Sequence, residues 1–309
     1  MNVIITGCAG FIGSHAVEKF LFGGHNIVGV DCMTYAASKK NMSNFIDKIR
    51  FYEVDIVNQD KIREIVKKHN IEWIINFAAE THVDNSINSA TPFLHSNING
   101  VYSLLEVCRT EGCKLFQIST DEVYGSILKG AFKETDNFNP RNPYSATKAA
   151  AEHLVTSYHN THGLEYKIVR MSNNFGPRQN KEKFIPTILR SLKENKKIPI
   201  YGDGKNIRDW FYVKDCVKCI LEVFENGQIN QVYNLSLKDE RENIEVVRAI
   251  LEIKDCSFDE NVEYIKDRPG HDFRYSIDNK KFLKLKDIKR TDFKQALAAT
   301  TIESIKEKI

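Results

Sequence analysis

Residues 2–13 of the chain read Asn2-Val-Ile-Ile-Thr-Gly7-Cys-Ala-Gly10-Phe-Ile-Gly13. A short apolar run ends directly before three glycines spaced three residues apart, which predicts a strand, a tight turn and the start of a helix. In that context glycines let the backbone approach a pyrophosphate, whose charge is favoured at a helix N-terminus. The stretch therefore predicts a dinucleotide-binding turn made by Gly7, Gly10, Phe11, Ile12 and Gly13.

The alternation of short apolar runs with helical segments continues through the first half of the chain. It predicts an α/β fold in which a doubly wound parallel sheet of the Rossmann type is covered by helices on both faces. The expected strands are Val3–Thr6, Ile27–Val30, Arg50–Glu53, Trp73–Phe77, Leu115–Ser119 and Tyr166–Arg170. The expected helices lie near residues 12–22, 58–69, 92–110 and 144–162.

After Arg170 the pattern is less regular. Short strands are expected near 198–201 and 232–235, and helices near 183–195, 213–225, 243–253 and 292–308. We therefore expect residues 1–170 to form the dinucleotide-binding domain and residues 171–309 a smaller α/β substrate domain. Whether some of the later segments rejoin the sheet stays open.

Composition excludes several classes of function. The net charge of +3 is small, and lysines and arginines are scattered among acids, so no nucleic-acid partner is expected. No apolar stretch is long enough to span a membrane. Seven cysteines without framework spacing, and a first strand that begins at once, predict reduced thiols and a cytoplasmic location. Cys216 and Cys219 are expected to be small buried residues rather than a redox or metal pair, and no metal site is expected.

Acidic residues follow the second and third expected strands. Asp31 lies at the usual distance from the glycine turn to accept hydrogen bonds from both ribose hydroxyls, and it would repel a 2′-phosphate. That favours NAD over NADP. Asp55, followed by Ile56, is placed to reach the adenine amino group, although a simple helix cap is the alternative for this acid. After the fourth strand, the small residues Ala78 and Ala79 beside Phe77 would allow the cofactor close.

The run Ser119-Thr-Asp-Glu-Val-Tyr-Gly125 precedes Tyr144-Ser-Ala-Thr-Lys148. A Tyr and a Lys four residues apart share one face of a helix, and the ammonium would favour the phenolate. That pair indicates a nicotinamide-dependent oxidoreductase. Two adjacent carboxylates supply an additional acid and base, which simple alcohol oxidation does not need. The residues therefore predict an oxidation coupled to a further proton transfer.

With these motifs the chain resembles the extended short-chain dehydrogenase/reductase superfamily, and within it the nucleoside-diphosphate-glucose 4,6-dehydratases. Further landmarks are Phe77-Ala-Ala-Glu-Thr-His-Val-Asp84, Ser172-Asn-Asn-Phe-Gly-Pro177, Tyr201-Gly-Asp-Gly-Lys-Asn-Ile-Arg-Asp209 and Asp267-Arg-Pro-Gly-His271. The triplet Thr120-Asp121-Glu122 distinguishes the dehydratases from other enzymes of the superfamily, because its epimerases and decarboxylases generally lack the adjacent acids at this point. Such an epimerase or decarboxylase is the alternative on the same scaffold.

The resemblance implies roles for five residues. Tyr144, assisted by Lys148, would remove the proton of the sugar 4-hydroxyl, which Thr120 orients. Glu122 would remove the C5 proton, and a protonated Asp121 would donate to the departing 6-hydroxyl. Hydride would pass from C4 to NAD and return to C6, so that the NAD stays tightly bound and is recycled.

The resemblance also implies the rest of the site. Its cofactor residues would include Thr34, Ser96 and Asn174, together with Tyr144 and Lys148. A nucleoside-diphosphate sugar would contact Thr81, Thr120, Asn173, Lys183, Phe184, Tyr201, Arg208, Asn243, Arg268 and His271. The nucleotide is dTDP or UDP, with dTDP modestly favoured, and the 4-keto-6-deoxy product would lead to rhamnose or to other deoxysugars.

The helices expected near 92–110 and 144–162 carry more apolar residues than one core face requires. We therefore expect a homodimer joined by a four-helix bundle.

Overall fold

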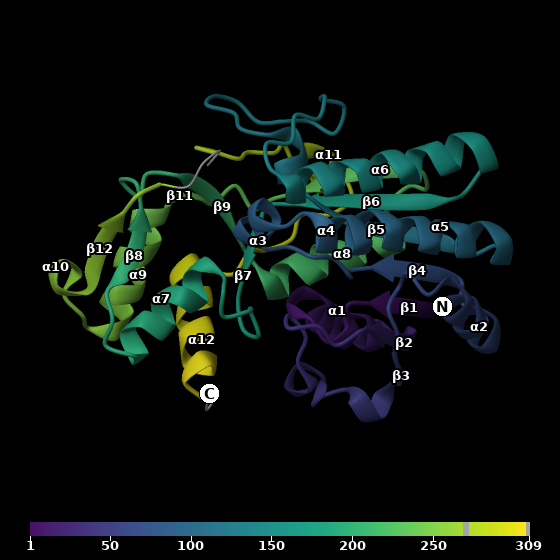
Figure 1. The fold of residues 1–309 in the computed structure, drawn as a ribbon, viewed down its shortest axis with the longest axis horizontal. Coiled ribbons are helices and arrows are strands. Elements are labelled where there is room, and N and C mark those ends of the chain that lie inside the picture. Colours follow the sequence, from purple (N-terminus) through teal and green to yellow (C-terminus); the bar gives the residue numbers. More distant parts are fainter. Residues whose placement is uncertain (268–271, 307–309) are drawn as a thin grey trace.

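The computed structural model describes residues 1–267 and 272–306, with side chains described up to residue 302. A central sheet of seven parallel strands has the order β10-β6-β5-β4-β1-β2-β3 (Figure 1). Its strands are β1 Asn2–Thr6, β2 Asn26–Asp31, β3 Arg50–Glu53, β4 Trp73–Asn76, β5 Lys114–Thr120, β6 Tyr166–Met171 and β10 Gln231–Leu235. The predicted doubly wound parallel sheet is confirmed.

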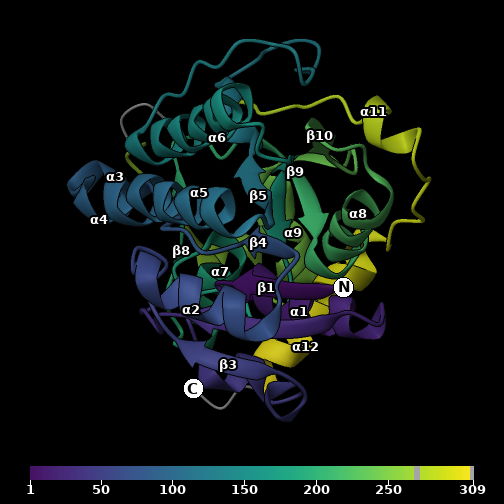
Figure 2. The same ribbon diagram turned by 90° about the vertical axis from the view of Figure 1, so that its right-hand side faces the viewer.

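Successive side chains of each strand enter opposite layers of the core, as the period of a strand requires. Val3 and Ile5 of β1 pack in one cluster with α1 (Phe11–Phe22) and α8 (Val213–Asn226). Ile4 packs in the other, with α2 (Gln59–His69), α5 (Gly100–Glu111) and α6 (Pro143–His162). Figure 2 shows the two helical layers on either side of the sheet.

The single helix expected near 92–110 is divided into three parts. α4 (Thr91–Phe93) leads into a π-helical segment, Leu94–Asn99, before α5 begins. The buried Asn97 amide donates to the Glu80 carbonyl at 3.0 Å and to Thr147 Oγ1 at 3.0 Å, and its oxygen accepts from the Glu80 N–H at 2.9 Å. These contacts with distant residues account for a widened helical turn that no local pattern reveals.

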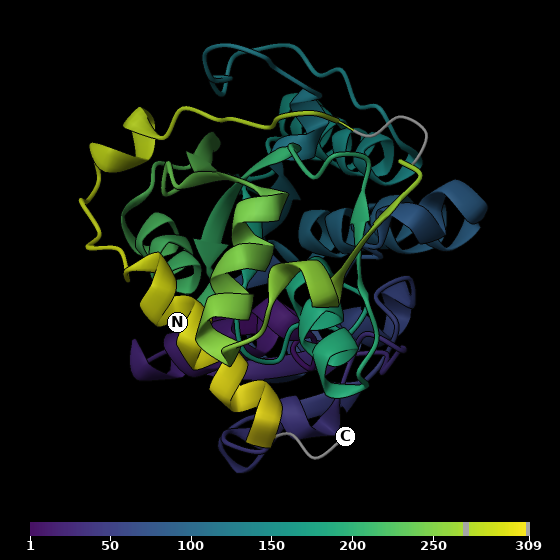
Figure 3. The same ribbon diagram turned by 90° about the vertical axis from the view of Figure 1, so that its left-hand side faces the viewer.

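Most of the segments after β6 form a smaller part of the molecule that faces the carboxyl ends of the central strands, at the left of Figure 1. It contains two small sheets, ordered β11-β9-β7 and β12-β8. Their strands are β7 Asn173–Phe175, β8 Ile198–Tyr201, β9 Ile207–Tyr212, β11 Glu240–Glu242 and β12 Val262–Ile265. The remaining helices are α3 Val83–Asn88, α7 Phe184–Lys193, α9 Asn243–Lys254, α10 Phe258–Asn261, α11 Lys280–Leu283 and α12 Phe293–Lys306. Figure 3 views this part directly, with α12 crossing it.

One later segment does rejoin the central sheet: β10 pairs in parallel with β6, from Gln231 opposite Lys167 to Leu235 opposite Met171. The division into two domains at residue 170 stays a prediction.

Cys216 and Cys219 are both buried in α8, and all seven cysteines are free thiols. Among the described residues, no helix combines the length and apolarity that crossing a membrane requires.

Candidate active site

The turn after β1 requires glycine at two positions. Gly7 has a φ of +65°, and a Cβ there would lie 2.8 Å from the backbone nitrogen of Ala78. A Cβ on Gly13 would lie 2.1 Å from the Gly7 carbonyl oxygen. The missing side chains let the turn lie against the end of β4 and let α1 begin directly beneath it, which is the geometry of a pyrophosphate cradle.

A pocket of about 210 Å³ opens above this turn. With one exception, every residue expected to contact the cofactor lines it. Those residues are Gly7, Gly10, Phe11, Ile12, Gly13, Asp31, Thr34, Asp55, Ile56, Phe77, Ala78, Ala79, Ser96, Tyr144 and Lys148. The exception is Asn174, which lines a second, larger cleft.

Asp31 joins the second strand to the glycine turn. Its Oδ2 accepts a hydrogen bond from Ala9 N at 2.9 Å, and its Oδ1 accepts from Met33 N at 2.8 Å. Burial raises the pKa of this carboxyl, and the two backbone donors oppose that rise. Asp31 thus lies on the pocket wall with lone pairs left to accept hydroxyl donors.

Asp55 does not cap the helix that follows it, because Asn58 Oδ1 accepts from Lys61 N as the N-cap of α2. Asp55 Oδ1 accepts from Val57 N at 3.1 Å, and its Oδ2 lies 3.1 Å from His95 Nε2. Its side chain is therefore held at the pocket rim rather than used as a helix cap.

The second cleft has a volume of about 380 Å³ and meets the first along the residues that line both: Phe11, Ile12, Thr81, Ser119, Tyr144, Met171 and Lys183. Eight of the ten residues expected to contact the substrate line it: Thr81, Thr120, Asn173, Lys183, Phe184, Tyr201, Arg208 and Asn243. Arg268 and His271, the other two, lie outside the described residues.

The two acids lie just past the carboxyl end of β5, in a 3₁₀ turn, Asp121–Tyr124. Asp121 is 2% exposed, and Thr120 Oγ1 donates to its Oδ1 at 3.3 Å, whereas its Oδ2 has no hydrogen-bond partner in the described structure. Burial raises the pKa of Asp121, and the charges of Glu122 and Asp209 raise it further. Asp121 is thereby suited to hold a proton at neutral pH.

Glu122 has a different environment. Burial raises its pKa, but the Arg208 guanidinium, a hydrogen bond from Asn142 and the Lys183 ammonium oppose the rise. Asn142 Nδ2 donates to Glu122 Oε2 at 3.4 Å. Two neighbouring carboxyls with unequal surroundings form the pairing of one acid with one base that an elimination needs.

Tyr144 and Lys148 lie on α6 and are both buried. In the chain by itself, burial and the Glu122 charge raise the pKa of Tyr144, so the lowering expected from Lys148 is not seen. Lys148 Nζ instead donates to the Ile118 carbonyl at 2.7 Å, and burial lowers its pKa to about 8. The Lys148 ammonium is directed at β5, and it is not among the groups that shift the pKa of Tyr144.

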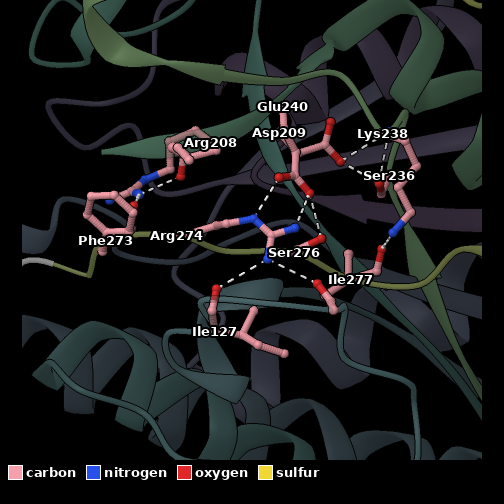
Figure 4. A network of polar contacts seen from close by, with 12 residues as sticks. Ile127, Arg208, Asp209, Ser236, Lys238, Glu240, Phe273, Arg274, Ser276 and Ile277 are labelled. Carbon is pink, nitrogen blue, oxygen red and sulfur yellow. Dashed lines mark hydrogen bonds and ion pairs between the residues drawn. The ribbon is translucent and has the colours of Figure 1, made fainter. Parts of the chain in front are cut away.

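Arg208 is held at the cleft by a segment that sequence reasoning missed (Figure 4). Its guanidinium donates to the carbonyls of Asp272 at 2.9 Å and Phe273 at 3.2 Å, and lies 4.4 Å from the centre of the Tyr275 ring. Arg274 fastens the same segment through two bonds to Glu240, of 2.6 and 2.7 Å.

The cleft residues that were not expected include Asn142, Asp272 and Tyr275. Tyr275 Oη donates to Asp272 Oδ2 at 2.6 Å. Asn142 had a usable signal, since an Asn before a Pro at the start of a helix predicts a cap. Asp272 and Tyr275 had none, because they reach the cleft only through tertiary structure.

This arrangement places an acid, a base and a Tyr/Lys pair where a cofactor pocket meets a cation-lined cleft. A family model described as GDP-mannose 4,6 dehydratase matches residues 4–300. The chain belongs to the GDP-mannose 4,6-dehydratase family.

Individual relatives agree with this family. The low-salt glycan biosynthesis protein Agl12 of Haloferax volcanii is 44% identical over 282 residues, which cover 90% of each protein. The dTDP-glucose 4,6-dehydratase DesIV of Streptomyces venezuelae, solved with NAD bound, superposes with a TM-score of 0.95 at 34% identity, covering 99% of this chain and 98% of that one. The UDP-glucose 4-epimerase of Thermotoga maritima shares the fold with a TM-score of 0.91 at 27% identity, covering 99% of each chain.

Proposed function

We propose that this protein is an NAD-dependent nucleotide-sugar 4,6-dehydratase that converts dTDP-glucose to its 4-keto-6-deoxy derivative and water. The observation that carries the proposal is the pair of acids beside Tyr144. Asp121 is buried with a raised pKa, whereas Glu122 next to it has three groups that stabilise its anion. The likeness to DesIV, itself a dTDP-glucose 4,6-dehydratase, supports dTDP over UDP as the nucleotide.

The glycine turn and Asp31 would hold NAD in the smaller pocket. The backbone cradle at Gly7 fits a pyrophosphate, and Asp31 fits two ribose hydroxyls. When bound, NAD would supply a hydride acceptor that is regenerated within the cycle.

The residues of the chain would then act in sequence. Tyr144 takes the proton of the 4-hydroxyl while Thr120 orients that hydroxyl. Glu122 removes the C5 proton once C4 is a ketone, and Asp121 gives its proton to the 6-hydroxyl as it leaves as water. The hydride taken from C4 then returns to C6 and C5 is reprotonated, which gives the 4-keto-6-deoxy sugar. Lys183 and Arg208 would bind the diphosphate, because fixed cations pair with phosphate oxygens.

The test is to incubate the purified protein, without added NAD, with dTDP-glucose or UDP-glucose and to follow product mass. Loss of one water, faster from dTDP-glucose, is the expected result. Loss of water mainly from UDP-glucose would overturn the choice of nucleotide. A product of unchanged mass that migrates as another hexose would identify the epimerase alternative, for which the shared fold is the supporting observation.

A variant separates the two halves of the reaction. Glu122→Gln should retain oxidation at C4 but stall elimination, so that reduced nicotinamide accumulates in its absorbance spectrum. Glu260→Gln changes an exposed acid on α10 and should behave as wild type. Normal turnover by Glu122→Gln would remove Glu122 as the base.

The proposal includes a homodimer joined through α5 and α6. These helices lie side by side (Figures 1 and 2), and the neighbouring surface exposes Leu94 and Tyr102, at 47% and 49%. Large apolar side chains exposed on α5 and on the turn before it are what a bundle interface would cover. A monomer mass by light scattering at micromolar protein would contradict the dimer.

We also propose a cytoplasmic location, which the seven free thiols support. The product would then serve the synthesis of rhamnose or another deoxysugar.

A further inference from the structure

A buried ion pair lies behind the proposed catalytic residues. Glu152 of α6 and Arg170 of β6 are 2% and 5% exposed. Arg170 donates from Nε to both carboxylate oxygens, at 3.1 and 3.0 Å, and from a terminal nitrogen to Oε2 at 2.7 Å. This fork geometry fixes the guanidinium and carboxylate planes relative to each other.

Each partner of the pair also holds one end of the segment that contains Thr120, Asp121 and Glu122. Ser119 Oγ, directly before the triplet, donates to Glu152 Oε1 at 2.5 Å. On the other side of the triplet, the Tyr124 hydroxyl accepts from an Arg170 terminal nitrogen and donates to Asn234 Oδ1 at 3.0 Å. The ion pair therefore brackets the triplet from both sides.

The same pair ties the triplet to the helix that carries Tyr144 and Lys148. Glu152 lies four residues after Lys148, one turn along the same face of α6. Its carboxylate raises the pKa of Lys148, against the lowering caused by burial. A single carboxylate thus connects α6 to β5 through Ser119 and to β6 through Arg170.

Stability alone does not account for such a pair. Removing two charges from water is costly, and well-packed apolar residues often stabilise a fold as well as a buried ion pair does. What apolar packing does not provide is directional bonds to Ser119 and Tyr124, the two residues that border the triplet.

We propose that Glu152 and Arg170 are positioning residues, which hold Thr120, Asp121 and Glu122 in register with Tyr144 and Lys148. This inference rests on the proposed dehydratase function. The misplacement of a catalytic group by about 1 Å lowers a rate by roughly a hundredfold, so the bonds to Ser119 and Tyr124 should affect turnover more than substrate binding.

The test uses Ser119→Ala and Tyr124→Phe, which remove the two bonds and leave the ion pair intact. Each should lower kcat by roughly tenfold or more while KM changes less than about threefold. KM should change little because the proposed substrate cations, Lys183 and Arg208, lie on other segments. Reduced nicotinamide should accumulate during turnover, because the elimination residues are displaced. The double variant should lose less than the product of the two single losses, since both act on one segment.

Matched controls remove equally buried hydroxyls elsewhere. Ser103→Ala lies on α5, and Tyr233→Phe lies on β10, where its hydroxyl accepts from Gln228 N at 2.9 Å. Both controls should keep the wild-type kcat, and their melting temperatures should be similar to those of Ser119→Ala and Tyr124→Phe.

If the wild type is active and Ser119→Ala and Tyr124→Phe both keep its kcat, this inference would be overturned and the proposed function would stand. A loss of kcat in the controls that matches the loss in the variants would overturn it as well, since the effect would then follow stability. A wild type that dehydrates neither dTDP-glucose nor UDP-glucose would overturn the proposed function and this inference together.

Discussion

Asn142 fixes Glu122 and the start of helix α6 with one side chain. Its Nδ2 donates to Glu122 Oε2 at 3.4 Å, and its Oδ1 accepts from Ser145 N at 2.8 Å as the N-cap of α6. The proposed elimination base is thereby tied to the helix that carries Tyr144, the proposed oxidation base.

Asn142→Asp should shift the pH dependence of dehydration. Asp caps a helix as well as Asn does, so the free energy of unfolding should change by less than about 0.5 kcal/mol. Its anion beside Glu122 should raise the pKa of Glu122 and so lower the fraction of ionised base at a given pH. The acidic limb of the kcat profile should therefore move to higher pH. Asn142→Ser, which caps without an added charge, should move it less, and identical profiles for wild type and Asn142→Asp would contradict the contact.

Asp31→Ala should weaken the preference for NAD over NADP by about tenfold or more, because a carboxylate that repels a 2′-phosphate is lost. Affinity for both cofactors should fall, since Asp31 also holds Ala9 N in the turn. The ratio of the two dissociation constants is the measurement. Asp47→Ala, at an exposed site in the 3₁₀ turn Ile46–Lys48, provides the control. An unchanged ratio would remove Asp31 from the ribose site.

Gly7→Ala should give a protein that purifies without NAD. Its Cβ would lie 2.8 Å from Ala78 N, and the φ of +65° is strained for any L side chain. Gly112→Ala is a matched control, since Gly112 has a φ of +74° with nothing within 4 Å of its Cβ. The control should lose about 1 kcal/mol of stability and keep the cofactor. Equal NAD content in the two variants, by absorbance after denaturation, would contradict a cradle at Gly7.

Asp121→Asn should abolish dehydration and stabilise the fold at neutral pH. The pKa of Asp121 is raised from an ordinary value of 3.8, so the folded protein binds this proton more tightly than the unfolded chain does. The bound proton stabilises the fold fully at pH values below the pKa that Asp121 has in the unfolded chain. Above that pH the stabilisation falls by about 1.4 kcal/mol per pH unit, until the pH reaches the pKa that Asp121 has in the folded protein. Asparagine does not titrate and has no such loss. The free energy of unfolding of Asp121→Asn should therefore exceed that of the wild type by more at pH 7 than at pH 5.

Urea unfolding of both proteins at the two pH values measures this difference. An equal advantage at pH 5 and pH 7 would show that Asp121 does not hold its proton. Asp259→Asn, at an exposed position, should show no change with pH.

Much of the fold was predictable because its signals are local. The apolar run Asn2–Thr6 and the glycines after it specify a strand, a turn and a helix within 13 residues, and the structure has β1 and α1 there. The division of the helix near 92–110 was not predictable, because it depends on hydrogen bonds from Asn97 to Glu80 and Thr147.

The sequence by itself determined which chemical groups are available and in what local order: the glycine turn, Asp31, the acids at 121 and 122, and the Tyr/Lys pair on one helix face. Those features follow from spacing along the chain. Only the tertiary structure decided the raised pKa of Asp121, the direction of Lys148 and the support of Arg208 by residues 272–275. These features depend on burial and on contacts between distant segments, such as that of Arg274 with Ile127, 147 positions apart. Patterns among neighbouring residues do not predict them.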